Sequence, residues 1–364
     1  MARLLCLTLL LIQLSVSPVA GLSLELIAEQ NLPYDAMVAG TWFNGLSGLV
    51  YEQEKGCFYA VSDDRSYHQP ARYYRIEAAV AGERNPRISL TPKEVVFFRD
   101  AKGERFKRGQ LDLEGITLLT NHHLLVSSEG SVLQGRAPSI TEFQQDGSWV
   151  RSWLLPPQFL PAGQGDQGVR ENLGCESLSV TPDGAFVFTA NEQALKQDGE
   201  RATVAAGSPI RIVKYDRTGK VLGHYPYLVS PIPNPLGLNA FQADNGLVEL
   251  LALDEENLLS LERSWLPAGN KVSLRIYHLK LHGVEDVSGL ASLQGIATAF
   301  VKKSLVLDLE TLLPLADEAY PSLDNMEGMS FGPELADGSR TLVLVSDGNF
   351  SPRQRTLFLI FRLR

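Results

Sequence analysis

A motif that occurs five times constrains the fold of this 364-residue chain more than any other feature of the sequence. Each copy has a small or acidic residue, a short apolar stretch, a turn and a second apolar stretch that ends near a carboxylate. The copies span residues 45–64, 112–130, 174–193, 246–265 and 325–349. Alternation with a period of two, and turn residues such as Pro182-Asp183-Gly184, predict that each copy is a β-hairpin.

Strand-like segments also follow the hairpins, which gives a repeating unit of four strands, the size of a propeller blade. The last copy is followed by only one such segment, residues 355–364, whereas residues 22–29 alternate correctly and can supply the missing strand. We therefore predict an all-β propeller of four-stranded blades, with the ring closed by the N-terminal strand. Five blades are readable, a sixth is possible between His282 and Asn325, and a β-sandwich is the alternative.

The N-terminal segment predicts an exported protein. Residues 1–20 contain one basic residue, an apolar run and a stretch of small residues, which is the order of a secretory signal. Residues 21–364 are then a single propeller domain, expected to be a monomer that is secreted or periplasmic. Without Arg3 the chain has 32 basic and 42 acidic side chains, a net charge of −10 (33 − 1 − 42). This balance excludes nucleic acid as a partner, and no later segment is long enough to span a membrane.

Two cysteines, Cys57 and Cys175, remain after the expected signal. Each lies beside a predicted strand, in different repeats. A domain of this length can bury enough apolar surface without a disulfide, so we expect two unpaired, buried thiols, although a disulfide is the alternative in an oxidising compartment.

The acidic residues of the repeats converge if the fold is a propeller, because the first strand of each blade lines the central channel. First strands begin with Glu114, Glu176, Glu249 and Glu327, with Ser47 in the first copy, and second strands end with Asp63, Glu129, Glu192, Glu262 and Asp347. Like charges at close range raise one another's pKa, so this arrangement needs compensation.

Three sources of compensation are open. Oxygen ligands without His or Cys suit Ca²⁺. Alternatively, an arginine pairs with an acid that precedes it in the sequence: Arg65 with Asp63, Arg263 with Glu262, and Arg353 or Arg355 with Asp347. In the third case, each glutamate only accepts hydrogen bonds from backbone N–H groups of a neighbouring blade.

Three pairs of motifs resemble a known family. Residues 112–116 with 126–130, 172–178 with 189–192, and 325–329 with 345–350 are similar to the phytase-like family, described as "esterase-like activity of phytase". The resemblance extends from about Leu24 to the C-terminus. It implies an exported β-propeller that hydrolyses phosphate or carboxylic esters, related in architecture to calcium-dependent phytases. The matching positions are Glu114, Glu129, Glu176, Glu192, Glu327, Asp347 and Asn349.

Two functional hypotheses follow. In the first, Asp63, Glu129, Glu192 and Asp347 hold Ca²⁺, Arg65 and Arg353 bind the anionic part of a small ester or phosphate-ester substrate, and Glu114, Glu176 and Glu327 are candidates for catalysis. No nucleophile elbow, zinc-protease helix, P-loop or dinucleotide fingerprint points to another chemistry. In the second hypothesis, the propeller is not an enzyme and binds a protein or a glycan.

Overall fold

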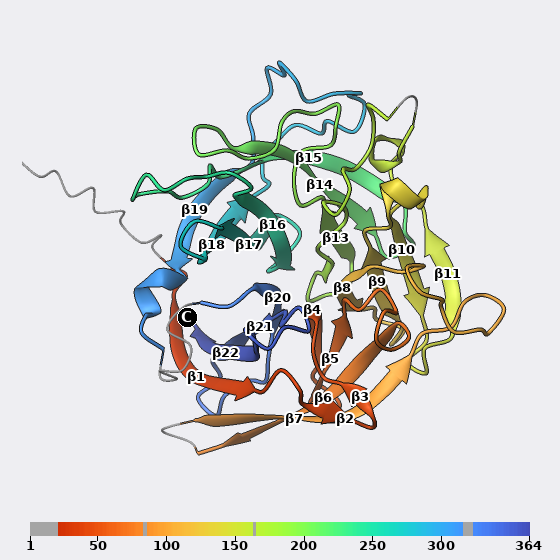
Figure 1. Ribbon diagram of the computed structural model, residues 1–364, viewed down its shortest axis with the longest axis vertical. Coiled ribbons are helices and arrows are strands. Elements are labelled where there is room, and N and C mark those ends of the chain that lie inside the picture. The colour runs from red at the N-terminus through yellow and green to blue at the C-terminus, as the bar shows by residue number, and fades with distance from the viewer. Residues whose placement is uncertain (1–20, 83–85, 163–164, 316–322) are drawn as a thin grey trace, which may run out of the picture.

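Five antiparallel sheets of four strands each stand around a common axis, so the chain forms a five-bladed propeller (Figure 1). The structure is a computed structural model that describes residues 21–82, 86–162, 165–315 and 323–364. The secretory signal expected at residues 1–20 lies outside these residues. Among the described residues, no helix has the length and apolar character needed to cross a membrane.

The first four blades run from the axis outward in chain order. The first blade contains β4 (Leu46–Glu52), β5 (Cys57–Ser62), β6 (Arg72–Ala81) and β7 (Arg87–Phe97), and the second contains β8 (Leu113–Leu118), β9 (Leu124–Ser128), β10 (Ser139–Phe143) and β11 (Trp149–Trp153). The third contains β12 (Ser179–Val180), β13 (Phe186–Ala190), β14 (Ser208–Asp216) and β15 (Val221–Val229), and the fourth contains β16 (Asp244–Ala252), β17 (Asn257–Leu266), β18 (Lys271–Lys280) and β19 (Lys302–Asp308).

The fifth blade is built from both ends of the chain, as predicted. It contains β20 (Met326–Phe331), β21 (Arg340–Ser346) and β22 (Thr356–Leu363), and its outermost strand is β1 (Leu24–Leu32). β1 pairs with β22 from Leu24 opposite Leu363 to Leu32 opposite Thr356. Closure by the N-terminal strand covers the edge that β22 would otherwise expose.

The remaining elements are short. A small hairpin of β2 (Met37–Val38) and β3 (Thr41–Trp42) precedes the first blade, and the helical segments of the described residues are the 3₁₀ turns η1 (Val132–Gln134), η2 (Pro157–Phe159) and η3 (Leu309–Leu312). The described part of the segment between His282 and Asn325 supplies β19 and η3, so it completes the fourth blade and forms no sixth one.

The core of the described residues consists of apolar clusters, each of which joins the faces of two neighbouring blades. For example, Phe358 and Ile360 of the fifth blade pack with Phe58 and Tyr74 of the first. Every blade therefore depends on its neighbours for burial of its apolar side chains. Cys57 and Cys175 are buried and unpaired, which confirms the expectation for the two thiols.

Close to the axis the first strands of neighbouring blades touch backbone to backbone. A Cβ added to Gly48 would lie 2.4 Å from the carbonyl oxygen of Glu114, and one added to Gly115 would lie 2.7 Å from the backbone nitrogen of Leu178. These glycines follow Ser47 and Glu114 in the repeat. The motif therefore combines a polar residue with the glycine that lets the next strand approach.

This contact predicts the effect of one methyl group. Gly48→Ala should lower the free energy of unfolding by about 1–3 kcal/mol, because the obstacle is backbone that cannot rotate away. Gly289→Ala is the matched control, since a Cβ there has no atom within 4 Å. Urea denaturation of both variants measures the difference. Equal stabilities of the two variants would contradict the axial contact.

Candidate functional site

A β-bulge interrupts the first strand of four blades at the same point. The register shifts at Ser47 in the first blade, at Glu114-Gly115 in the second, at Val248 in the fourth and at Glu327 in the fifth. In the third blade Glu176 lies just beyond β12, beside the bridge between Cys175 and Asn191. Because a bulge turns a side chain out of the regular alternation, this shared irregularity directs the acids toward the axis.

The register corrects the predicted alignment of the fourth copy by one residue. Leu247 pairs with Glu262 just as Leu46 pairs with Ser62, and the bulged residue is Val248. Glu249 therefore corresponds to Gly48, and Arg263, not Glu262, corresponds to Asp63. The matching letters of residues 45–48 (Gly-Leu-Ser-Gly) and 246–249 (Gly-Leu-Val-Glu) carried this signal in the sequence.

Both misaligned glutamates are structural. Burial raises the pKa of Glu249, whose carboxyl group accepts hydrogen bonds from the backbone of Leu250 and of Leu178 and Met329 in neighbouring blades. Glu249 thus has the inter-blade role that was one of the predicted alternatives. Glu262 joins the fourth blade to the third, because it accepts hydrogen bonds from the hydroxyl of Tyr227 in β15 and from Lys303 Nζ in β19 at 2.6 Å.

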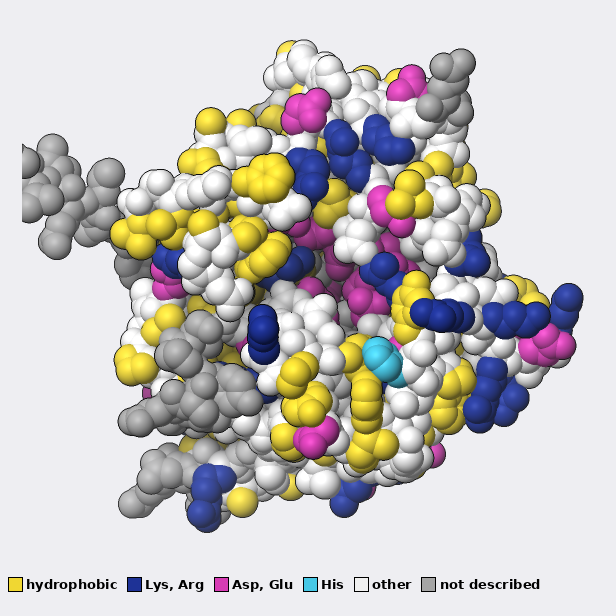
Figure 2. Space-filling model, viewed as in Figure 1, with side chains coloured by type: hydrophobic (Ala, Val, Ile, Leu, Met, Phe, Trp, Pro, Cys, Tyr) yellow, Lys and Arg dark blue, Asp and Glu magenta, His cyan; other side chains and the backbone are white. Residues whose placement is uncertain are grey.

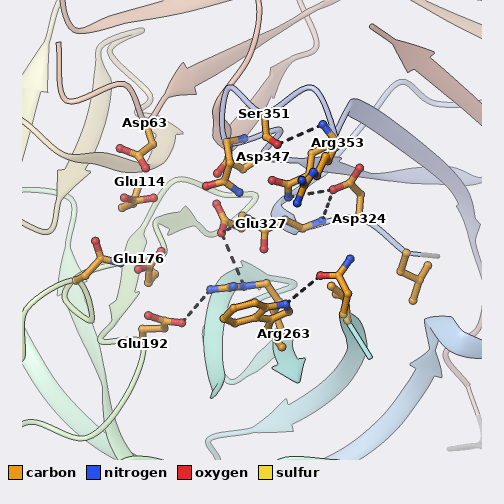
Figure 3. A pocket seen from close by; sticks show the side chains of 18 of the residues that line it. Asp63, Glu114, Glu176, Glu192, Arg263, Asp324, Glu327, Asp347, Ser351 and Arg353 are labelled. Carbon is orange, nitrogen blue, oxygen red and sulfur yellow. Dashed lines mark hydrogen bonds and ion pairs between the residues drawn. The ribbon is translucent and has the colours of Figure 1, made fainter. Parts of the chain in front are cut away.

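The other predicted acids meet in one cavity of about 800 Å³ at the end of the channel. Its lining includes most of the predicted site residues: Asp63, Arg65, Glu114, Glu176, Glu192, Glu327, Asp347 and Arg353. Glu129 lies buried beside it. Figure 2 shows acidic side chains gathered inside the hollow at the middle of this face, with basic side chains around it. Figure 3 shows Asp63, Glu114, Glu176 and Glu192 together on one side of the cavity.

A first group of three carboxylates has its own counter-ion. Oxygens of Asp63, Asp112 and Glu114 lie within 4.8 Å of one another. The Nε of Arg65 is 2.6 Å from Asp112 Oδ1 and 3.6 Å from Asp63 Oδ1, and its guanidinium also donates to Asn172. The predicted pairing of Arg65 with Asp63 is therefore present, but the closer partner is Asp112 of the next repeat.

In a second group of three carboxylates, only Glu192 is paired with an arginine, and Glu129 and Glu176 have no counter-ion among the described residues. Oxygens of Glu129, Glu176 and Glu192 lie within 4.8 Å of one another, and all three residues are buried. Glu129 Oε1 accepts the backbone N–H of Gly174 at 2.6 Å, whereas Oε2 is buried without a hydrogen-bond donor among the described residues. The carboxyl group of Glu176 lies within hydrogen-bonding reach of Glu129. Two adjacent carboxyl groups require either a shared proton or a cation between them.

Burial and mutual repulsion dominate the electrostatics of the cavity. Burial, followed by the charge of Glu129, raises the pKa of Glu176 well above its usual range. Burial and Asp63 do the same for Glu114, and burial and Asp244 for Glu192. The pKa of Asp112 is raised to about 10, mainly by burial and by Asp63. The cavity therefore holds more acid than its own side chains neutralise.

Arg263 compensates the acids on the other side of the cavity. Its Nη2 is 3.2 Å from Glu192 Oε1 and its Nε is 3.7 Å from Glu327 Oε1 (Figure 3). The prediction that Arg263 pairs with Glu262 was wrong, because the two side chains leave the strand on opposite faces. Burial raises the pKa of Glu327 to about 7, although Arg263 lowers it. Sequence reasoning missed this role of Arg263.

Arg353 differs from the other two cavity arginines. It is exposed, and no carboxylate of the described residues lies within ion-pair distance of it. Arg355 is buried with its Nε 3.9 Å from Asp324, so neither residue pairs with Asp347 as predicted. Asp347 instead accepts the backbone N–H of Asn349 at 2.8 Å, and burial together with Glu327 raises its pKa.

The chain belongs to the phytase-like family, described as "esterase-like activity of phytase", which matches residues 41–350. The expected family membership is thus confirmed. No curated protein sequence matches the chain.

Similar solved structures are distant. An endo-arabinase from Bacteroides thetaiotaomicron is 9% identical with a TM-score of 0.44, and the alignment covers 91% of this chain and 96% of that one. A thermostable family-43 glycoside hydrolase is 10% identical with a TM-score of 0.44, over 88% and 90% of the two chains. A luciferin-regenerating enzyme is 12% identical with a TM-score of 0.40, over 94% and 95%. At these values the likeness says nothing about the chemistry of this chain.

The raised carboxyl pKa values predict how stability depends on pH without divalent cations. Because these groups hold protons in the folded chain that they lose on unfolding, stability should fall as the pH rises from about 7 to 9. In this range Asp112, with its pKa of about 10, still holds its proton in the folded chain, whereas His224, whose pKa burial lowers to about 4, is neutral. Melting temperatures in a chelator check this, and a flat or rising profile would contradict the buried acid cluster.

Glu176→Gln should separate stability from cation binding. The amide copies the protonated carboxyl group, so in chelator at about pH 8 the variant should melt at a higher temperature than the wild type. Added Ca²⁺ should raise the melting temperature of the wild type and leave that of the variant nearly unchanged.

Glu142→Gln is the control for this variant. Glu142 is also buried, but it accepts hydrogen bonds from Arg151 at 2.7 Å and Trp153 at 3.2 Å, and such partners lower its pKa to about 2. Its amide variant should therefore be destabilised, with the Ca²⁺ response retained. Destabilisation of both variants alike would contradict the electrostatic account.

Proposed function

We propose that the cavity binds a divalent cation, Ca²⁺ by the chemistry of its donors, and that the chain hydrolyses phosphoric or carboxylic esters there. One observation carries the proposal: Glu129, Glu176 and Glu192 are buried within 4.8 Å of one another, with one oxygen of Glu129 meeting no donor of the described residues. Oxygen-only donors fit a hard cation such as Ca²⁺.

The residues that would hold the cation are the three of this group, with Glu114 beside them. Of these three, Glu192 also has its Oε1 paired with Arg263. Asp63 and Asp347, which the sequence analysis also named as ligands, line the same cavity outside this group, and Asp63 is paired with Arg65. When bound, the cation would polarise the ester and make an attacking water more acidic.

The chain's own side chains supply the other requirements of ester hydrolysis. Arg353 has its charge uncompensated at the cavity and is suited to bind the anionic part of a substrate. Arg65 is already bonded to Asp112 and Asn172, which makes it an organiser of the acids more than an anion clamp. Glu327 accepts a hydrogen bond from Asn325 Nδ2 at 2.9 Å, is not a member of the three-carboxylate group, and is the candidate to accept a proton from water.

We also propose that the protein is exported, because residues 1–20 have the composition of a secretory signal. Calcium sites of extracellular modules need only weak affinity, on the order of 10⁻⁴–10⁻³ M. A small group of carboxylates with few preorganised donors suits such a compartment.

Hydrolysis of p-nitrophenyl phosphate and p-nitrophenyl acetate tests the function. A chelator should lower kcat/KM about 100-fold on the preferred ester, and Ca²⁺ should restore it. Glu129→Gln should cause a similar loss, because it removes the charge of the one carboxylate with an unmet oxygen.

Glu54→Gln is the control, since Glu54 belongs to a separate group with Glu52 and His122 near the opposite end of the channel. It should keep full activity. If neither ester is turned over with Ca²⁺, Mg²⁺ or Mn²⁺ present, the enzymatic proposal fails and a binding propeller remains.

A further inference from the structure

The acid-lined cavity has an apolar wall that the proposed chemistry does not use. The acids of the two carboxylate groups come from the first three blades, whereas Trp265, Val272 and Leu323 line the cavity from the fourth blade and the segment before the fifth. Trp265 is 40% exposed at the end of β17, and its Nε1 lies 3.4 Å from Asn270 Oδ1 in the following turn. This contact orients the indole within the wall.

The apolar wall continues outside the cavity along the loop between β15 and β16. Phe241 and Leu236 of this loop are 75% and 74% exposed. The loop ends at Asp244, which pairs with Trp265 across β16 and β17, and Leu238 reaches Gly269 in the turn that contains Asn270. Figure 2 shows hydrophobic side chains along one side of the hollow. Exposed apolar groups that adjoin a cavity are a feature of ligand sites.

The charges of the cavity restrict the other part of a substrate. Seven carboxylates and three guanidinium groups line it among the described residues. Arg65 and Arg263 are paired with acids, which leaves Arg353 for a substrate anion. A polyanion such as a multiply phosphorylated sugar would bring several charges against this acid excess and would have no use for Trp265.

We propose that the substrate has a single ester group, phosphoric or carboxylic, attached to an apolar ring or chain. The apolar part lies against Trp265. This inference rests on the proposed function, because it assumes that the ester group binds at the acid cluster. The ester would lie between the carboxylates and Arg353, with its apolar part directed toward Trp265 and Val272 and, when long, toward Phe241. Stacking on an aromatic side chain adds to the area it buries.

Binding of two phosphonates tests this without relying on turnover. Phenylphosphonate and methylphosphonate carry the same anionic group and differ in the apolar part. In calorimetric titrations with Ca²⁺ present, the wild type should bind phenylphosphonate about tenfold more tightly than methylphosphonate. Trp265→Ala should remove most of this preference by weakening phenylphosphonate alone, and Trp265→Phe should keep part of it.

Trp149→Ala is the matched control, because Trp149 is 38% exposed on β11, the outer strand of the second blade, and does not line the cavity. It should leave both affinities unchanged. Equal binding of the two phosphonates, or an unchanged preference in a Trp265→Ala protein that still melts cooperatively, would overturn the apolar subsite and leave the proposed function standing. Failure of both phosphonates to bind would contradict phosphate-ester binding at this cavity, and with it this inference.

Discussion

The close approach of the first strands at the axis is the constraint on which the rest of this structure depends. Five blades meet so tightly that Gly48 and Gly115 stand against the backbone of the next strand. The residue before each glycine lies in a bulge. Glu114 lines the cavity, whereas the hydroxyl of Ser47 donates a hydrogen bond to the carbonyl oxygen of Leu113 in the next blade. Ring closure by β1 holds this arrangement, because every blade buries its apolar face against its neighbours. The fold thus forces acids from separate repeats into one volume, where water cannot screen them fully.

Two arginines of the chain neutralise several of these acids. Arg65 serves Asp63 and Asp112, and Arg263 serves Glu192 and Glu327. Arg263 stands where the other four blades carry an acid, so the ring is not symmetric. The acid that remains without a counter-ion is at Glu129 and Glu176, whose carboxyl groups adjoin each other. The nearby arginines, Arg65 and Arg263, are paired with other acids. Either a shared proton or an external cation balances these two carboxyl groups, and the cation is our proposal.

The repeat predicted the architecture because it contains two patterns of a propeller. Apolar and polar residues alternate within each strand, and the same hairpin recurs in each blade. The donor strand at residues 22–29 and the convergence of Glu114, Glu176 and Glu327 followed from that geometry and are present. The fourth copy was misaligned because Glu249 was matched with the glutamates of the other copies, although it stands one residue later, at the position that Gly48 has in the first copy. That single step assigned Glu249 and Glu262 to the site and hid Arg263. The apolar wall was not predicted, because Trp265 is the last residue of the fourth copy, and Val272 and Leu323, which line the wall with it, lie outside the repeat.

The claim that a cation belongs between Glu129, Glu176 and Glu192 is tested most directly by anomalous scattering. Crystals grown with Mn²⁺, which takes the same oxygen donors as Ca²⁺ and scatters anomalously, would locate bound ions independently of any activity. The account predicts a strong anomalous peak within coordination distance of all three carboxylates. Absence of a peak there, or a peak only at Glu52, Glu54 and His122 near the opposite end of the channel, would contradict it.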